Sequence, residues 1–220
     1  MIDRLVLRLP FSFRALIWSV CFLHCSDSIF STESLYPVEH SPQKLTPLME
    51  RELRGCFEFF WEEWNDDPNS PTYGMSNGDY VGLNRYSPIP IEHQGFYFTA
   101  VIIGVERGWI SREDGENRII ITLKTLKSLK RIKGFWYHFI DPDSGKRGWK
   151  DSHNIELSNA SAGTMLLGAL AAAEYFGGEI EKLTYELYEA MDWKGFTNPV
   201  TKHPYLACYP EDLPVNIPSG

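Results

Sequence analysis

The chain has 220 residues, of which 43 % are hydrophobic and 14 % aromatic, and this is the composition of a globular protein. Its formal net charge of −8 at pH 7 argues against nucleic acid and polyanionic substrates as partners, because an acidic surface repels both. The four cysteines form no CxxC pair and no closely spaced framework, so neither a disulfide scaffold nor a zinc site is indicated. Cys56, within the apolar stretch GCFEFFW, is interpreted as a core residue.

Residues 1–25 have the pattern of an export signal. Three arginines precede the apolar run ALIWSVCFL at 15–23, which suits a signal peptide but falls well short of the ~20 residues of a membrane span. Cys25 follows this run and is a candidate for lipid attachment, although His24 stands where a small residue is expected. A buried N-terminal helix and a misassigned start codon are the alternatives. We expect an exported protein that is periplasmic, anchored to the outer membrane by lipid, or extracellular.

A Ser/Pro-rich linker at 26–45 is expected to lead into one helical domain at 46–220. The first helix of this domain is predicted to begin at Pro47, after the N-cap residue Thr46, and to end near Asn65. Apolar residues recur in it at three- and four-residue spacing, which is typical of an amphipathic helix.

A long loop is predicted next, at 66–92, with four prolines and several turn signals. Loops of this length in a compact domain are usually functional or disordered. The three tyrosines at 73, 80 and 86 favour an ordered loop.

Four further helices are predicted, at 95–107, from Ser111 to Gly134, at 158–176 and at 179–193. Ser111 is the expected N-cap of the second of these, and Asp114 three residues later makes an approximate capping box. The helix at 158–176 is apolar on nearly every face, which is typical of a buried helix, and the one at 179–193 is amphipathic.

The order of these helices predicts the fold class. Helices rich in small residues at 95–107 and 158–176 are each followed, after a short turn, by a helix with a charged face. Such alternation of inner and outer helices builds an α/α toroid with its longer loops on one rim. We therefore predict an all-α protein, with a helical bundle or a helical repeat as the alternatives.

The stretch GFWYHFIDPDSGKRGWKD at 134–151 combines five aromatic residues, a histidine and three aspartates. A sugar site uses both kinds of side chain, because pyranose faces stack on aromatic rings and sugar hydroxyls bond to carboxylates. The candidate substrate-binding residues are Trp136, Tyr137, His138, Trp149 and His153. For the three larger rings a place in the wall of the core is an equal alternative, and for the histidines the alternative is a structural role.

Hydrolysis of a glycosidic bond requires one carboxyl group to protonate the leaving oxygen and a second to activate water or attack carbon. Glu156 is the foremost candidate, because it stands just before the buried helix at 158–176, where a helix N-terminus would meet a cleft. The alternative is an acid that interacts with the helix dipole. Asp151 could share the rim, with a solvated loop position as its alternative. Asp141 and Asp143 belong to a turn signal.

Five blocks of the sequence, taken in order, resemble the glycoamylase-like family, which includes bacterial glycoside hydrolases acting on β-1,2-linked glucans. The blocks are FEFFWEEWN, GVERGWISRED, GFWYHFIDPDSGKRGW, IELSNASAGTMLLGALAAAEYFGG and MDWKGFTNP, and the resemblance extends from about Leu53 to Asp212. It implies an (α/α)6 toroid, an inverting mechanism with carboxylates across a central cleft, a neutral glucan as partner and no cofactor or metal. It matches Glu156 with the acid that precedes an inner helix, and Trp136 to His138 with a segment bordering the cleft.

Two features depart from the family pattern. Ser161 stands where many relatives have an acid one turn into the inner helix, so a second carboxylate is not identified. The five predicted helices are fewer than half of a complete toroid, which matches only the N-terminal half of the family. We therefore expect a truncated or split member, covered at its open edge by a second chain or by self-association. A glycoside hydrolase-like protein is the first reading, and a non-catalytic carbohydrate-binding or scaffold remnant is the alternative.

Overall fold

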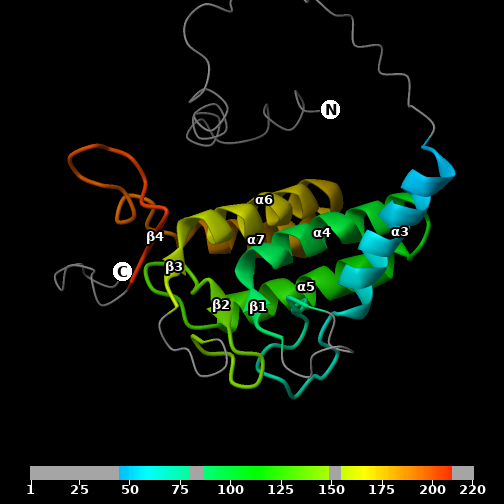
Figure 1. Cartoon of the computed structure of the whole chain (residues 1–220), viewed down its shortest axis with the longest axis horizontal. Helices are drawn as coiled ribbons and strands as arrows, with labels where there is room; N and C mark the ends of the chain where they lie inside the picture. The colour runs from blue at the N-terminus through cyan, green and yellow to red at the C-terminus, as the bar shows by residue number, and fades with distance from the viewer. Residues whose placement is uncertain (1–44, 80–86, 149–154, 210–220) are drawn as a thin grey trace, which may run out of the picture. The chain divides into compact units, whose positions relative to one another are not determined.

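The computed structural model describes residues 45–79, 87–148 and 155–209, and five helices dominate them (Figure 1). These are α3 (Pro47–Glu62), α4 (Ile91–Glu106), α5 (Arg112–Ser128), α6 (Asn159–Phe176) and α7 (Gly178–Glu189). The strands β1 (Ile89–Pro90) and β2 (Phe139–Ile140) form one antiparallel pair, and β3 (Leu157–Ser158) and β4 (Ala207–Cys208) form another. The predicted fold class, a partial α/α toroid, is confirmed. None of the described helices has the length and apolarity of a membrane span.

Several helix ends differ from their predicted positions: α3 ends at Glu62 instead of near Asn65, and α7 ends at Glu189 instead of at 193. The helix α4 begins at Ile91, four residues earlier than expected, directly after Pro90 in extended conformation. The helix α5 ends at Ser128, short of Gly134, because Leu129 turns extended with ψ at 150°. Near this end the indole N–H of Trp136 donates to the carbonyl oxygen of Leu126 at 2.9 Å, which satisfies an acceptor of the last helical turn.

The N-terminus of α5 is capped as predicted. The hydroxyl oxygen of Ser111 accepts the backbone N–H of Asp114 at 3.0 Å and donates to its carboxylate at 2.6 Å. Two ion pairs, Lys124–Glu179 and Lys127–Glu186, join the charged faces of α5 and α7. Because all four side chains are substantially exposed, these pairs add little stability, and the buried apolar faces carry the packing.

The helices α4 and α6 pack at close range because each has a glycine at the contact. A Cβ atom on Gly95 would collide with the carbonyl oxygen of Thr164, and one on Gly168 would collide with that of Gly95. Along α6 the small residues Ala162, Ala169 and Ala172 are fully buried. The prediction of a buried α6 holds for one side of the helix, where eight of its 18 residues are buried, whereas Ala160, Leu167 and Glu174 lie exposed along another side.

The segment that follows α3 is ordered over the part that the structure describes, 63–79. Its backbone turns back so that Asn65 bonds to Met75 and Gly74. The side-chain amide of Gln94 on α4 is fully buried and pairs with both backbone groups of Ser76, at 2.9 Å each. This pair fixes the loop against the first turns of α4. Of the predicted loop tyrosines, Tyr73 packs on Trp64, while those at 80 and 86 lie outside the described residues.

Candidate functional site

A short backbone ladder joins three segments that are distant in sequence. The backbone N–H of Ile91 donates to the carbonyl oxygen of His138 at 3.1 Å, and that of His138 donates to Glu156 at 2.9 Å. An antiparallel bridge between Tyr137 and Leu157 continues the second contact. The ladder therefore brings the start of α4, the aromatic segment and the residues before α6 side by side.

The imidazole of His138 bridges two carboxylates at this ladder. Its Nδ1 lies 2.7 Å from Oε1 of Glu156, and its Nε2 lies 3.0 Å from Oε1 of Glu92. All three side chains are about one-quarter exposed. A neutral imidazole has one N–H and could donate to one carboxylate alone, whereas the cation donates to both. The geometry therefore favours a charged His138.

The pKa of His138 is raised, as expected for an imidazole that donates hydrogen bonds to two carboxylates. The hydrogen bond to Glu92 is the largest influence and raises the pKa of His138; burial opposes it, and the bond to Glu156 reinforces it. The net pKa is above the ordinary histidine value. The site therefore combines one cation with two acidic side chains.

Glu92 lies in the first turn of α4 and is held as a carboxylate. Burial pushes its pKa upward, but the hydrogen bond from His138 and the weaker polar influences of the Glu92 backbone N–H and of Ser161 together outweigh burial, so the pKa is lowered. Its second oxygen, Oε2, is buried and has no hydrogen bond of normal geometry among the described residues. A buried carboxylate oxygen without such a bond is uncommon and is often found at functional sites.

Two of the predicted site residues, Glu156 and His138, come together in the structure. Glu92 was missed by the sequence analysis, because the predicted helix began at Gly95 and left the acid in a loop. The signal that could have found it is Pro90, since a proline often stands directly at the start of a helix. With Pro90 as the boundary, Glu92 becomes an acid in a first turn, where it is favoured by the helix dipole.

Two predicted sugar-stacking residues, Trp136 and Tyr137, lie in the core instead. Trp136 is 1 % exposed and Tyr137 is 6 % exposed, which leaves neither ring a face for a pyranose. For Tyr137 the physical reason is alternation along an extended segment, since Tyr137 and His138 point to opposite sides. Trp136 is instead held in the core by the bond from its indole N–H to the carbonyl oxygen of Leu126. Three further candidates, Trp149, Asp151 and His153, lie outside the described residues.

Ser161, the first of the two departures from the family pattern, lies one turn into α6. Its backbone N–H is capped by the hydroxyl of Ser158 at 3.1 Å, and its side chain is buried next to Glu92. The carboxylate of Glu92 on α4 therefore lies beside position 161, where this chain has a serine and no acid. Among the described residues, no group of three His, Cys, Asp or Glu side chains could hold a metal ion.

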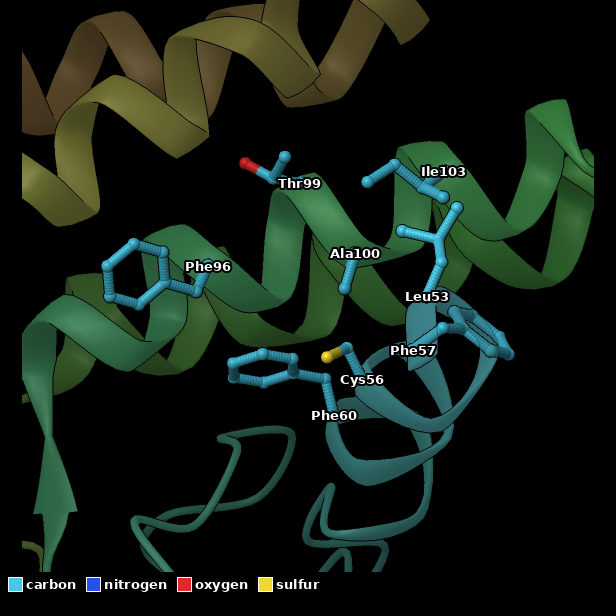
Figure 2. Close-up of a pocket in the computed structure, with 8 residues that line it drawn as sticks. All are labelled: Leu53, Cys56, Phe57, Phe60, Phe96, Thr99, Ala100 and Ile103. Carbon is cyan, nitrogen blue, oxygen red and sulfur yellow. The ribbon is translucent and has the colours of Figure 1, made fainter. Parts of the chain in front are cut away.

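A second concave feature lies between α3 and α4 and has a different chemistry. It is an open groove of about 200 Å³, lined by Leu53, Cys56, Phe57, Phe60, Phe96, Thr99, Ala100 and Ile103 (Figure 2). None of these described lining residues is acidic or a histidine. Cys56 lies exposed at this groove, so its interpretation as a core residue was wrong. The groove can bind apolar groups but offers no acid–base chemistry.

Comparisons with known proteins indicate the family of the chain. No family model matches the chain. A curated relative, the exo-β-1,2-glucooligosaccharide sophorohydrolase (non-reducing end) of Parabacteroides distasonis, is 30 % identical over 191 residues, which cover 82 % of this chain and 24 % of that protein. A glucoamylase-like protein of Bacteroides uniformis has a similar structure, with 23 % identity and a TM-score of 0.62 over 77 % of this chain and 42 % of its own.

An endo-β-1,2-glucanase of Chitinophaga pinensis, solved with sophorotriose and glucose, is also similar in structure. It has 23 % identity and a TM-score of 0.57, over 73 % of this chain and 40 % of its own. The chain thus spans about a quarter of the curated relative and about two-fifths of these structures. By sequence and by fold it is a partial match to the glucoamylase-like and endo-β-1,2-glucanase family.

Proposed function

We propose that this chain forms part of a glycoside hydrolase-like site for a neutral glucan, with Glu92 and Glu156 as its working carboxylates. The observation that carries the proposal is the bridge that His138 makes between them, at 2.7 and 3.0 Å. The names of the relatives support the substrate class, since two of them are enzymes of β-1,2-linked glucose oligomers and polymers.

The geometry suits acid–base hydrolysis, in which one carboxyl group protonates the leaving oxygen and the other acts on the opposite face of the sugar. Glu92 suits the second role, because its lowered pKa keeps it ionised and able to accept a proton from water or to stabilise positive charge. Glu156 is then the candidate for the first role, with the proton that it shares with Nδ1 of His138 at 2.7 Å passed on to the leaving oxygen. His138 is a positioning residue in this scheme, since it touches both carboxylates and fixes their separation.

The test is hydrolysis of sophorotriose by the full chain and by the variants Glu92→Gln and Glu156→Gln. Each variant is expected to lose activity by about 10²- to 10⁴-fold, while binding persists, because an amide keeps the shape but cannot exchange a proton. Glu189→Gln, an exposed acid at the end of α7, is the matched control and should retain full activity. Equal hydrolysis by all four proteins would overturn the catalytic role.

Binding of sophorotriose without hydrolysis by the unmodified chain would favour the alternative, a non-catalytic carbohydrate-binding protein with the same site. In that case Glu92→Gln and Glu156→Gln should weaken binding and leave no activity to lose. The two outcomes are separated by measuring released sugar and binding on the same samples.

We also propose a role for the groove between α3 and α4 as a packing face for apolar helices that lie outside the described residues, from a second chain or from self-association. Phe96 is 51 % exposed at this groove, and Leu48 and Met49 near the start of α3 are exposed as well. Exposed apolar clusters of this kind mark association surfaces. Size-exclusion chromatography with light scattering tests it: a stable, active monomer of the 220-residue chain would contradict the proposal.

A further inference from the structure

The antiparallel pair of β3 and β4 brings the C-terminal part of the described chain next to Glu156. Leu157 lies opposite Cys208, and Ser158 lies opposite Ala207. The same register holds one step further along, where the backbone N–H of Asn159 donates to the carbonyl oxygen of Leu206 at 3.1 Å. Continued by one residue in the other direction, this register places Tyr209 opposite Glu156.

Antiparallel pairing also places His138 opposite Glu156, on the side away from Tyr209, because Tyr137 is bridged to Leu157. His138, Glu156 and Tyr209 therefore form one row across three neighbouring segments. Residues directly opposite on antiparallel strands have Cβ atoms about 4.5–5.5 Å apart and share a face. The contact between His138 and Glu156 at 2.7 Å shows that this rule holds for the first two members of the row.

The exposure of the neighbouring residues indicates which face the row occupies. Leu157 is fully buried, and Cys208 opposite it packs against the hydrophobic core. Because successive residues of a strand point to opposite sides, Glu156 and Tyr209 share the face away from that core. Tyr209 is 38 % exposed, in contrast to the sealed rings of Trp136 and Tyr137.

We propose that Tyr209 is the aromatic wall of the saccharide site, so that a sugar ring packs on its face while the hydroxyls of the sugar reach Glu156 and Glu92. This inference rests on the proposed function and adds the residue that determines how the sugar is held. A tyrosine suits an uncharged sugar, because its ring offers apolar area to the C–H groups and its hydroxyl tolerates water. It also supplies the stacking surface that the sequence analysis assigned to residues of the core.

Tyr205 provides a matched control within the same segment. It is 40 % exposed, like Tyr209, but its backbone N–H donates to the carbonyl oxygen of Phe196 and its own carbonyl accepts from the side chain of Asn159. Tyr205 lies four residues before Tyr209. The register of β3 and β4, continued in that direction, places it opposite Ala160 in α6 and away from Glu156. An effect of general surface hydrophobicity would therefore be seen at both tyrosines, and an effect of the site at Tyr209 alone.

The experiment is a titration of the full chain with sophorotriose, followed by NMR or calorimetry, for the unmodified protein and for Tyr209→Ala, Tyr209→Phe and Tyr205→Ala. Tyr209→Ala is expected to raise the Kd about tenfold, which corresponds to about 1.4 kcal/mol. Tyr209→Phe and Tyr205→Ala are expected to bind within about twofold of the unmodified chain, because each keeps the ring at position 209. Circular dichroism spectra and melting temperatures should be unchanged, since the ring of Tyr209 is not part of the core.

The outcomes separate this inference from the proposed function. Unchanged binding by Tyr209→Ala, together with loss of hydrolysis in Glu156→Gln, would overturn the aromatic wall and leave the proposed function standing. An equal loss of binding in Tyr205→Ala would also overturn it. Absence of any binding by the unmodified chain would overturn both the inference and the function on which it rests.

Discussion

The aromatic side chains of the segment 135–137 and that of Phe96, at the groove between α3 and α4, lie in opposite environments. Phe135, Trp136 and Tyr137 stand next to the acidic site in sequence but are sealed in the core. Phe96, by contrast, is half exposed at a groove whose described lining carries no acid. Aromatic residues next to acids in the sequence therefore do not by themselves identify a sugar-stacking surface, because their exposure depends on the tertiary structure.

The largest expected effect is on stability, and it tests whether the ring of Trp136 is a core residue. Trp136→Ala should lower the free energy of unfolding by about 3–5 kcal/mol, because it leaves a large cavity and an unsatisfied carbonyl at Leu126. Chemical denaturation followed by circular dichroism measures it. A loss below about 1 kcal/mol would mean that this ring is not a core residue and would reopen its role as a sugar platform.

A second prediction concerns the seam that positions the first turn of α4. Gly95→Ala should destabilise the protein by about 1–3 kcal/mol, because the added methyl group meets the backbone of α6 and must displace it. The matched control is Gly163→Ala in α6, where an added Cβ meets nothing within 4 Å. There the better helix propensity of alanine should stabilise the protein by about 0.5–1 kcal/mol. Similar changes in melting temperature for the two variants would contradict the close packing of α4 on α6.

The polar site should make stability depend on pH with a defined sign. The pKa of His138 is raised above 6.5 in the folded state, so its contribution is fully present below about pH 6.5 and is lost as the pH rises through the raised value. The pKa of Glu92 is lowered below 4.5, so its contribution is present above about pH 4.5 and is lost as the pH falls through the lowered value.

The measurement for this pH dependence is the difference in unfolding free energy between the unmodified protein and His138→Gln. This difference should be largest near pH 5.5 and should shrink as the pH rises towards 9. A difference that is constant over this range would show that His138 does not bridge the two carboxylates as a cation. Exposed acids elsewhere on the surface are common to both proteins and cancel in the comparison.

The smallest expected effect on stability is at the groove. Phe96→Ser should change the free energy of unfolding by only about 0.5 kcal/mol, because half of this ring is already in water. The same variant should reduce association with other helices if the groove is a packing face. Light scattering measures the association, and unchanged association of Phe96→Ser would exclude Phe96 from that face.

The positions of the helices could be predicted from the sequence because their signals are local. Apolar spacing, the cap at Ser111 and the glycines after α4 and α6 lie within a few residues of the structure that they set. Helix boundaries were less certain where local signals were weak. The start of α4 is marked locally by Pro90, which also pairs with Phe139 of β2, whereas the extended Leu129 at the end of α5 has no comparable mark in the sequence.

The site itself could be predicted only in part. Glu156 and His138 were found because each stands in a segment with a recognisable pattern. Glu92 was not, because its role depends on a ladder that joins residues 46 positions apart in the chain. No local pattern records such a register.

The sequence by itself determined an acidic, mainly helical protein with small-residue helices packed inside charged ones, since helical periodicity is a property of neighbouring residues. The tertiary structure alone decided which aromatic rings are buried and which acids share His138. Strand register decides both, because a shift of one residue would exchange the two faces of each segment and bring Tyr137 to the place of His138.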